Sequence, residues 1–276
     1  MVRRHELADE SWVLIAPLPG PGRMGRPVRG RRQIVDGILW KPSAGAARRD
    51  LPERYGPWKT VRERFRPWSA DGAWDRSPAH VQQHSCAVGQ VDRIIVCVDS
   101  TTVRARQHAA GPEEGPREGG APGRSRGELT SRIHLARDRQ GRPLASTLTG
   151  GNVNDRTRFE AVVDRIEVIR PGPGGPRTRP DRVVADKGQS ARKVRAHLRG
   201  RGIDCAIPER VEQIGGRIRR GETRCRLDEA VCRRRNVMER CFNRLKRNRD
   251  PAARHDERAR RHQAMATLTC FRLRLP

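Results

Sequence analysis

Short apolar runs alternate with helical apolar spacings along the middle of the chain. Residues 93–99 (RIIVCVD) form a continuous β-branched run, which is typical of a buried strand. Residues 131–138 (SRIHLARD) alternate apolar and polar positions, as a half-buried strand does. A turn at Gln140 and Gly141 separates this segment from a third strand at 143–149. The last two strands are therefore predicted to form a hairpin.

Helices and strands then alternate in the pattern. A helix capped by Asn154 or Asp155 precedes a strand at 181–186, and a helix capped by Ser190 precedes a strand at 203–208. The apolar positions of these helices and of a later one are Phe159, Val162, Val163 and Ile166, then Val194 and Leu198, then Val237, Cys241, Phe242 and Leu245. The order β-β-β-α-β-α-β-α favours an α/β fold with a mixed five-stranded sheet and flanking helices, and it matches the ribonuclease H-like order.

The first 85 residues have a different character, because they hold all five Trp and the single Tyr. Helices are predicted from a cap at Asp9, around residues 34–40 and around residues 60–68. A small hydrophobic core is expected from apolar residues at helical spacing, namely Trp58, Val61, Phe65 and Trp68. We therefore expect a small, mainly helical N-terminal domain at 1–85, suited to DNA binding, before a second domain at 86–276.

The charge of the chain calls for a polyanionic partner. Lys and Arg outnumber Asp and Glu by 59 to 32, which gives a formal net charge of +27 at pH 7 and a pI near 11.5. DNA or RNA is the usual partner of so basic a protein. Part of the excess has a second explanation, because the cations are mostly Arg and the chain is rich in Ala, Gly and Pro, as in a GC-rich coding sequence.

Several protein classes are excluded by what the sequence lacks. No stretch approaches the 18 uncharged apolar residues of a membrane span, and the first residues have no apolar signal-peptide region. No basic amphipathic helix suggests a membrane partner, so a cytoplasmic location is expected. The seven Cys are scattered without a C-x2-C pattern, which argues against a disulfide scaffold or a zinc module.

Three carboxylates stand out in so basic a chain. Asp99 and Asp186 end two apolar strands, and both would project near the carboxyl edge of the sheet. Glu239 lies on the last helix among arginines. Together these residues could hold two divalent ions, Mg²⁺ or Mn²⁺, for phosphoryl transfer. The pattern leaves another explanation open, in which the aspartates begin turns and Glu239 forms a salt bridge.

Several long motifs in one order resemble a known family, the bacterial insertion-sequence transposases of the D-D-E type, in the insertion-sequence-four and -five groups. Its N-terminal domain is similar to LADESWVLIAPLP and to residues 50–76. Its first-Asp motif is similar to VDSTTVRARQHAAG (98–111), its second-Asp motif to residues 181–209, and its Glu motif to RRRNVMERCFNRLK. The segment between the catalytic acids is similar to residues 123–162.

This resemblance implies a ribonuclease H-like core in which Asp99, Asp186 and Glu239 are catalytic and hold two Mg²⁺ or Mn²⁺ ions. Water would cut the DNA at the element ends, and the exposed 3′-OH groups would attack target DNA by direct transesterification. The implied partners are double-stranded DNA, as terminal inverted repeats and target, and a second copy of the chain in a homodimer or higher synaptic complex. The implied location is the bacterial nucleoid.

The Glu motif of the family reads Tyr-x2-Arg-x3-Glu-x6-Lys, and here its positions fall on Cys232, Arg235, Glu239 and Lys246. Arg235 and Lys246 lie near the face of the helix that carries Glu239, which suits phosphate contacts. Solvated charge in an Arg-rich helix is the alternative. Further DNA contacts are expected from Arg104, Lys187 and Arg240.

Four departures from the family pattern weigh on activity. Cys232 replaces the signature Tyr, Gln189 stands where an aromatic residue is common, and Pro251 interrupts an atypical ending at 248–276. Glu257 stands where Lys is expected. These departures keep an alternative open, a decayed or domesticated DNA-binding protein that binds element ends without cutting. A ribonuclease H or structure-specific nuclease would share the fold, but the Glu motif and the two-domain layout disfavour it.

Overall fold

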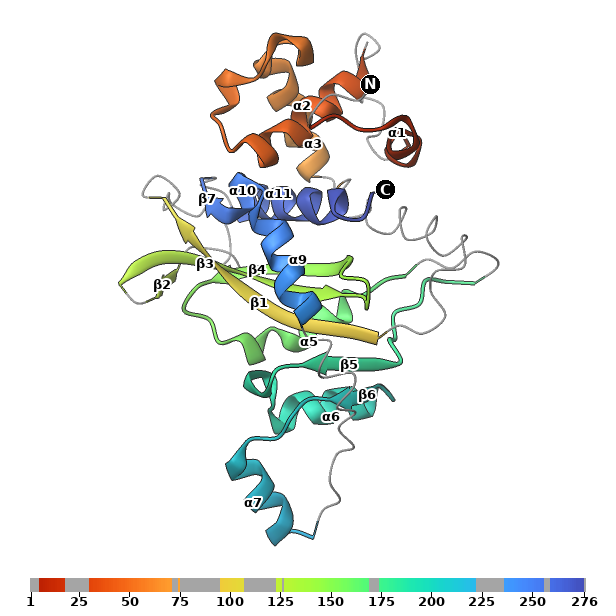
Figure 1. The fold of residues 1–276 in the computed structure, drawn as a ribbon, viewed down its shortest axis with the longest axis vertical. Coiled ribbons are helices and arrows are strands. Elements are labelled where there is room, and N and C mark those ends of the chain that lie inside the picture. Colours follow the sequence, from red (N-terminus) through yellow and green to blue (C-terminus); the bar gives the residue numbers. More distant parts are fainter. Residues whose placement is uncertain are drawn as a thin grey trace.

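The computed structural model describes residues 5–17, 30–70, 74, 95–106, 123–125, 127–168, 174–221, 236–255 and 259–275. Figure 1 shows three tiers along the long axis of the molecule: the N-terminal helices, the C-terminal helices below them, and a sheet with its own helices. The candidate site belongs to the sheet, so the arrangement of its strands matters most.

The sheet is mixed, as the sequence predicts. Its strands run in the order β2-β3-β1-β5-β6, with β4 added beside β3 and β7 beside β1. β3 lies antiparallel to both β1 and β4, whereas β5 and β6 continue the sheet parallel to β1. The strands are β1 (Ile95–Ala105), β2 (Gly123–Ser125), β3 (Glu128–Arg137), β4 (Pro143–Gly150), β5 (Arg182–Ala185), β6 (Asp204–Ala206) and β7 (Ala253–Arg254).

The predicted ribonuclease H-like topology is confirmed by an antiparallel β1-β3-β4 unit that β5 and β6 extend in parallel. The predicted number of five strands is too low, because the described chain holds seven. The additional ones, β2 and β7, have three and two residues and pair with longer strands, so no apolar run marks them in the sequence.

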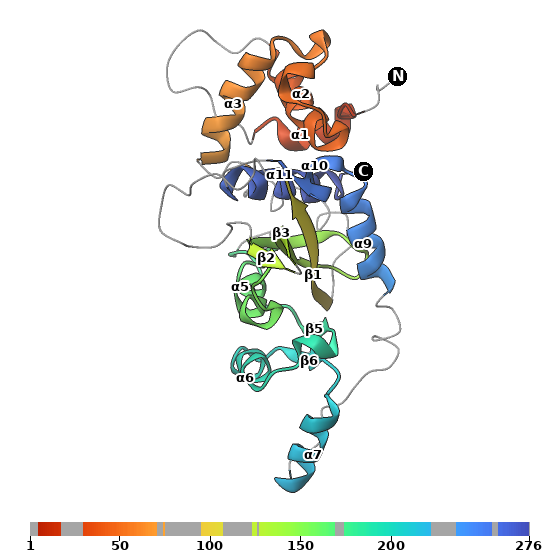
Figure 2. The same ribbon diagram turned by 90° about the vertical axis from the view of Figure 1, so that its left-hand side faces the viewer.

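Helices cover both faces of the sheet. α5 (Phe159–Asp164) and α6 (Arg192–Gly200) lie on one face, and α9 (Asn236–Lys246) lies on the other (Figure 2). The first face buries Phe159 and Leu198 against Val96 and Val98 of β1. On the second face α9 and α11 (Ala259–Arg272) pack around Val103 of β1. The helices that the apolar spacing predicts in this region are therefore all present.

Local details at two helix starts differ from the prediction. The N-cap of α1 (Asp9–Ile15) is Ala8, and Asp9 instead forms an ion pair with Arg32. The N-cap of α6 is Ala191, and the Ser190 hydroxyl instead donates to Gln213, 2.6 Å away. Asn154 does act as a cap, because its side chain accepts the Arg156 backbone N–H of a 3-10 turn that precedes α5.

The segment after Ser190 contains a helix that the sequence pattern missed. α7 (Val211–Arg219) follows β6, and the pair Gly215 and Gly216 inside it weakens any helical prediction. The Gln213 side chain accepts the Arg210 backbone N–H, 3.1 Å away, so it helps to begin the helix. The described chain also has short 3-10 turns, η1 (Arg48–Asp50), η2 (Glu53–Tyr55), η4 (Asp155–Thr157) and η5 (Lys187–Gln189).

The N-terminal helices α2 (Arg31–Ala44) and α3 (Trp58–Ala70) form where the sequence predicts them. Their core, which includes Phe65 and Trp68, also takes in Met265 and Phe271 of α11. α11 therefore packs between the N-terminal helices and the sheet. The domain boundary expected at residue 85 lies outside the described residues and stays a prediction.

The segment from 248 onward, which the sequence marks as atypical, is part of this framework. A short helix, α10 (Arg249–Ala252), contains Pro251 and follows the end of α9 at Lys246, so the proline stands where the longer helix has stopped. The helix α11 then contributes Met265 and Phe271 to one hydrophobic cluster and Ala266 and Cys270 to another.

Two further sequence expectations can be compared with the described part of the chain. Its cysteines, Cys97, Cys205, Cys241 and Cys270, are all free thiols. Burial raises the pKa of the Cys241 thiol to about 11, which keeps it protonated near neutral pH. Among the described helices, none has the length and apolar character that crossing a membrane requires.

Candidate active site

Asp99 and Asp186 are brought side by side by the pairing of β1 with β5. These strands are parallel, and the last pair in their register is Val98 with Ala185. The next residue in each chain is the aspartate. The two carboxylates that the sequence predicts at one edge of the sheet therefore do meet there.

One feature of β1 differs from the prediction, because the strand does not end at Asp99. It continues to Ala105, and its pairing with β3 runs on from Asp99 opposite Leu135 to Arg104 opposite Thr130. The continuation, STTVRA, is rich in β-branched residues but polar, so a search for apolar runs stops too early. Asp99 lies where the β5 partner ends, and the carboxyl-edge location holds for that reason.

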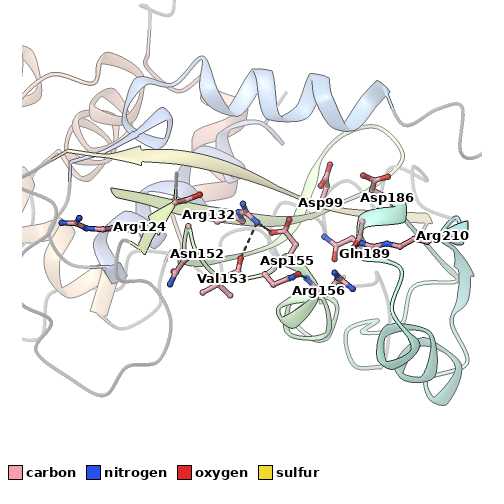
Figure 3. A pocket seen from close by; sticks show the side chains of 14 residues that line it. Asp99, Arg124, Arg132, Asn152, Val153, Asp155, Arg156, Asp186, Gln189 and Arg210 are labelled. Atoms are coloured by element: carbon pink, nitrogen blue, oxygen red, sulfur yellow. Dashed lines mark hydrogen bonds and ion pairs between the residues drawn. The ribbon is translucent and has the colours of Figure 1, made fainter. Parts of the chain in front are cut away.

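Both aspartates point to the face of the sheet that α9 covers. Side chains alternate along a strand, and Cys97 and Val103 of β1 pack in the cluster that contains Phe242 of α9, so Asp99 belongs to that face. Figure 3 shows the Asp99 and Asp186 carboxylates on the same side, pointing away from Asp155.

Glu239 lies in the first turn of α9, three residues before Phe242, and its side chain is exposed. An acidic residue there also favours the helix dipole. The part of the chain that the structure describes contains no group of three or more Asp, Glu, His or Cys placed to hold one metal ion. The structure thus pairs Asp99 with Asp186 and places Glu239 on the helix above the same face, outside their immediate cluster.

The chemistry of this donor set fits a hard divalent cation. Two carboxylates beside each other offer oxygen ligands, which Mg²⁺ and Mn²⁺ prefer. Both side chains are partly exposed at the edge of a cavity, so an ion can reach them. The Asp99 carboxylate also accepts the Ser100 backbone N–H at 2.8 Å, which restrains its orientation.

The cavity beside the aspartates has a volume of about 420 Å³ and is strongly polar. Arg132 is held there by the Asp155 carboxylate at 2.7 Å and lies 3.5 Å from the Val153 carbonyl oxygen (Figure 3). The walls of the cavity come from β1, β2, β3, the turn before α5, η5 and the loop that leads to α7. The lining residues are Asp99, Arg124, Ser125, Arg132, Gly151, Asn152, Val153, Asn154, Asp155, Arg156, Asp186, Gly188, Gln189 and Arg210.

The described residues among those expected to contact DNA are exposed, and they come from different elements. Lys187 begins η5 directly after Asp186, and Arg240 and Lys246 are exposed on α9. Arg104 forms an ion pair with Glu128 at 3.0 Å, further along β1. Arg235 lies outside the described residues, and so does Cys232.

Sequence reasoning missed the arginines of the cavity, Arg124, Arg132, Arg156 and Arg210. In a chain with 59 Lys and Arg, no single arginine stands out by its presence. A usable signal was the turn GGNVNDR after the hairpin, because Asn154 caps it and fixes where Asp155 and Arg156 lie.

His134 is a buried titratable group next to this cavity. Its Nε2 lies 2.8 Å from the Thr149 hydroxyl, and its Nδ1 lies 3.7 Å from the Asp155 carboxylate. Burial lowers the pKa of His134 from 6.5 to about 4, and the nearby Asp155 charge only partly opposes the shift. The imidazole is therefore neutral in the folded protein near pH 7.

This shift predicts acid destabilisation. Because the folded pKa of His134 lies below its unfolded value, the unfolded state binds more protons, and stability is lost as the pH falls from about 6.5 to about 4. The loss should be about 3 kcal/mol, from roughly 1.4 kcal/mol per pKa unit. Urea unfolding at several pH values checks this against His134→Gln, which should show a flatter profile over that window. Parallel profiles for the two proteins would count against the assignment.

The chain matches two family models. Residues 7–77 match one described as "Putative transposase of IS4/5 family", and residues 91–273 match one described as "Transposase DDE domain". The second match spans well over half of the chain and contains Asp99, Asp186 and Glu239.

Two relatives are similar to parts of the chain, and one of them is described as a transposase. The protein y4sN of Sinorhizobium fredii, described as uncharacterized, is 35% identical over 107 residues, which cover 38% of this chain and 81% of that protein. The "Putative transposase for insertion sequence element IS402" of Burkholderia cepacia is 42% identical over 85 residues, which cover 31% of this chain and 40% of the relative.

Among solved structures, the "Mos1 transposase paired-end complex with left transposon end" aligns over 93% of this chain and 82% of that chain, with 13% identity and a TM-score of 0.26. A similarity so loose supports no argument about this protein. The family match over residues 91–273 does, together with the paired strand-end aspartates and the ribonuclease H-like sheet. This chain belongs to the DDE transposases and is a DNA transposase of that family.

Proposed function

We propose that Asp99, Asp186 and Glu239 are the catalytic acids of this transposase and that they hold two divalent ions, Mg²⁺ or Mn²⁺. One observation carries the proposal: the register of β1 and β5 places Asp99 beside Asp186, on the sheet face that α9 covers. Glu239 is one turn from the α9 residues that pack on this face, so it lies on the same side of the sheet as the pair.

The protein residues of such a site orient the DNA and balance its charge. Two ions in this position would activate the attacking oxygen and stabilise the leaving oxygen of a phosphoryl transfer. The carboxylates fix where the reacting phosphate lies, and the Asp99 orientation is restrained by the Ser100 N–H. Exposed cations next to the acids, Lys187 and Arg240, would neutralise neighbouring phosphates.

The substrate of this activity is DNA, and we propose that it consists of the terminal inverted repeats of an insertion element and a target duplex. Cleavage would leave 3′-OH groups that join the target by transesterification. A homodimer or higher complex would bring two ends together, in the cytoplasm at the nucleoid. The net charge of +27 supports extensive phosphate contact and a steep dependence of binding on salt.

Metal removal tests the activity. A plasmid that carries the gene with its genomic flanks supplies the element ends in their natural context. The purified protein is expected to cut this plasmid at the element boundaries with Mg²⁺ or Mn²⁺ and to leave it intact with EDTA. Cleavage that persists in EDTA would refute the metal-dependent mechanism. Binding without cleavage in either metal would favour the binding-only alternative.

A measurement without catalysis tests the metal site separately. If Asp99 and Asp186 hold the ions, Mn²⁺ should raise the melting temperature of the wild-type protein, because a ligand that binds only the folded state stabilises it. The double variant Asp99→Asn/Asp186→Asn should lose this increase. An equal increase in both proteins would place the ions elsewhere.

A further inference from the structure

The cavity beside Asp99 and Asp186 carries positive charge that the proposed catalytic acids do not require. We refer to it as the arginine groove, defined by Arg124, Arg132, Arg156 and Arg210. Three aspartates, Asp99, Asp155 and Asp186, also line the cavity, so its positive charge depends on which arginines a carboxylate neutralises. The distribution of partners among these arginines indicates which of them face a ligand.

Arg132 has a structural role in the groove, because it forms an ion pair with Asp155. Its Nη1 donates to the Asp155 carboxylate at 2.7 Å, and the Arg132 and Asp155 side chains are 22% and 30% exposed. This ion pair fixes the turn before α5 against β3. It also neutralises Asp155, so that carboxylate does not repel an anion in the groove.

Arg210 is fixed in place but keeps its charge. Its Nε donates to the Lys187 carbonyl at 3.2 Å, and its Nη2 donates to the Gly188 carbonyl at 3.1 Å. Carbonyl partners orient a guanidinium without neutralising it, and each guanidinium has five N–H donors. Arg210 can therefore bind a phosphate oxygen as well.

Arg156 lies opposite, on the turn that Asn154 caps. Within the described residues its guanidinium has no carboxylate partner, and its side chain is half-buried at the groove. Arg124 lies further along, exposed on β2 (Figure 3). The groove thus has uncompensated guanidinium groups on both walls.

Gln189 supplies an independent indication of a ligand. Its side chain is 4% exposed and lines the groove, yet its Oε1 has no hydrogen-bond partner among the described residues. A buried polar group without a partner is unfavourable, so such groups usually face a ligand or water. The Gln189 carboxamide oxygen is therefore available to a ligand in the groove.

The groove is open to solvent and about the size of a small-ligand site. Its volume of about 420 Å³ is in the range of pockets that hold a ligand such as a nucleotide. The groove lies along β1 between two of its partners. Among the described strands, the pairing of β1 with β5 ends at Val98 and its pairing with β7 begins at Arg104, so neither of these strands covers this edge of β1 from Asp99 to Val103. A narrow polar groove of this kind suits a nucleotide-sized piece of a single strand.

We propose that the arginine groove binds the sugar-phosphate backbone of a single DNA strand next to the reacting phosphate. Arg156 and Arg210 contact phosphate from opposite walls, and the Gln189 carboxamide bonds to the same nucleotide. The Asp99 and Asp186 carboxylates point away from Arg156, so a strand held in the groove would pass around the edge of the sheet to reach them (Figure 3). The inference rests on the proposed function, because it takes Asp99 and Asp186 as the site where the strand reacts.

Binding of two probes tests the groove. One probe is a short duplex with a single-stranded extension, and the other is a blunt duplex of the same sequence. In metal-free buffer the wild type should prefer the extended probe, and Arg156→Ala should remove most of that preference, a loss of about tenfold. The slope of log K against log salt for the extended probe should become less steep by about 0.7.

Arg158→Ala is the matched control, because Arg158 belongs to the same turn and loses the same charge but does not line the groove. It should keep both the preference and the slope. The proposal is overturned if the wild type shows no preference for the extended probe, if Arg156→Ala keeps that preference, or if Arg158→Ala loses it equally. Arg124→Ala, at an exposed position, provides a second groove variant if Arg156→Ala fails to fold.

The outcome separates this inference from the proposed function. If Arg156→Ala behaved like Arg158→Ala while wild-type cleavage still required Mg²⁺, the proposal for the groove would be wrong and the proposal for the catalytic acids would stand. The reverse would hold if Arg156→Ala lost the extended probe but the wild type cut no DNA with any divalent metal.

Discussion

Asp99→Asn is expected to lower the rate of DNA cleavage by at least about a thousandfold, since losing several kcal/mol of charge stabilisation at about 1.4 kcal/mol per tenfold has that effect. Asn has nearly the same shape as Asp and retains an oxygen that can accept the Ser100 N–H. The change therefore removes the charge and little else. Cleavage of the flanked plasmid over time measures the effect.

Binding of DNA by this variant should stay near the wild-type level or become slightly tighter, because one negative charge leaves a surface that meets phosphates. Asp204→Asn is the matched control. Asp204 begins β6 in the same sheet, is exposed and forms a surface ion pair with Arg182. It should leave cleavage unchanged. If Asp99→Asn cleaved as fast as Asp204→Asn, Asp99 would not be a catalytic acid.

Glu239→Gln extends the test to the acid that the structure leaves apart from the pair. If Glu239 joins the aspartates when DNA and metal bind, this variant should lose cleavage as severely as Asp99→Asn. Full activity in Glu239→Gln would remove Glu239 from the site while leaving Asp99 and Asp186 in it.

The order of helices and strands could be predicted because each buried element leaves a local pattern. RIIVCVD and RVVA are apolar runs, and Phe159 to Ile166 follow helical spacing, so burial on one face decides each element. The second half of β1 could not be predicted in this way. Its polar, β-branched residues are strand because β3 pairs with them, which is a tertiary effect.

One part of the candidate site could be predicted from the sequence, and another part depends on the tertiary structure. The meeting of Asp99 and Asp186 follows from topology, since both follow apolar runs in neighbouring parallel strands. The arginine groove depends on where the turn around Arg156 and the loop around Arg210 lie after folding. Arg is too abundant in this chain for its position in the sequence to indicate such a groove.

The ending of the chain shows a further limit of pattern reasoning. Residues 259–272 contain few large apolar residues, and Thr267 and Thr269 interrupt them. Both threonines are nevertheless buried, because α11 is covered by the N-terminal helices on one side and by the sheet on the other. A helix buried on two sides shows no single apolar stripe, so it resembles a degraded sequence.

Lys41→Met is expected to produce the largest loss of stability, about 3–5 kcal/mol in the free energy of unfolding, because it removes one member of a buried ion pair. The Lys41 ammonium lies 2.7 Å from both carboxylate oxygens of Asp250. The two side chains are only 11% and 2% exposed. Urea unfolding at pH 7 measures the change.

Lys193→Met is the matched control, because Lys193 also pairs with a carboxylate, Glu160 at 3.2 Å, but is 85% exposed. An exposed ion pair contributes about 0–1 kcal/mol, so this control should stay close to the wild type. Similar losses for Lys41→Met and Lys193→Met would mean that burial does not strengthen the Lys41–Asp250 pair.

The double variant Lys41→Met/Asp250→Leu separates two contributions to stability. One is the cost of burying a carboxylate without Lys41, and the other is the net contribution of the ion pair. Because replacing both members of a buried ion pair with apolar residues is often neutral or stabilising, the double variant should recover most of the lost stability. The pair joins α2 to α10, so it links the N-terminal helices to the C-terminal segment. If the double variant is stable but binds element ends poorly, the pair serves to orient the N-terminal helices for DNA. Normal binding would assign the pair to stability alone.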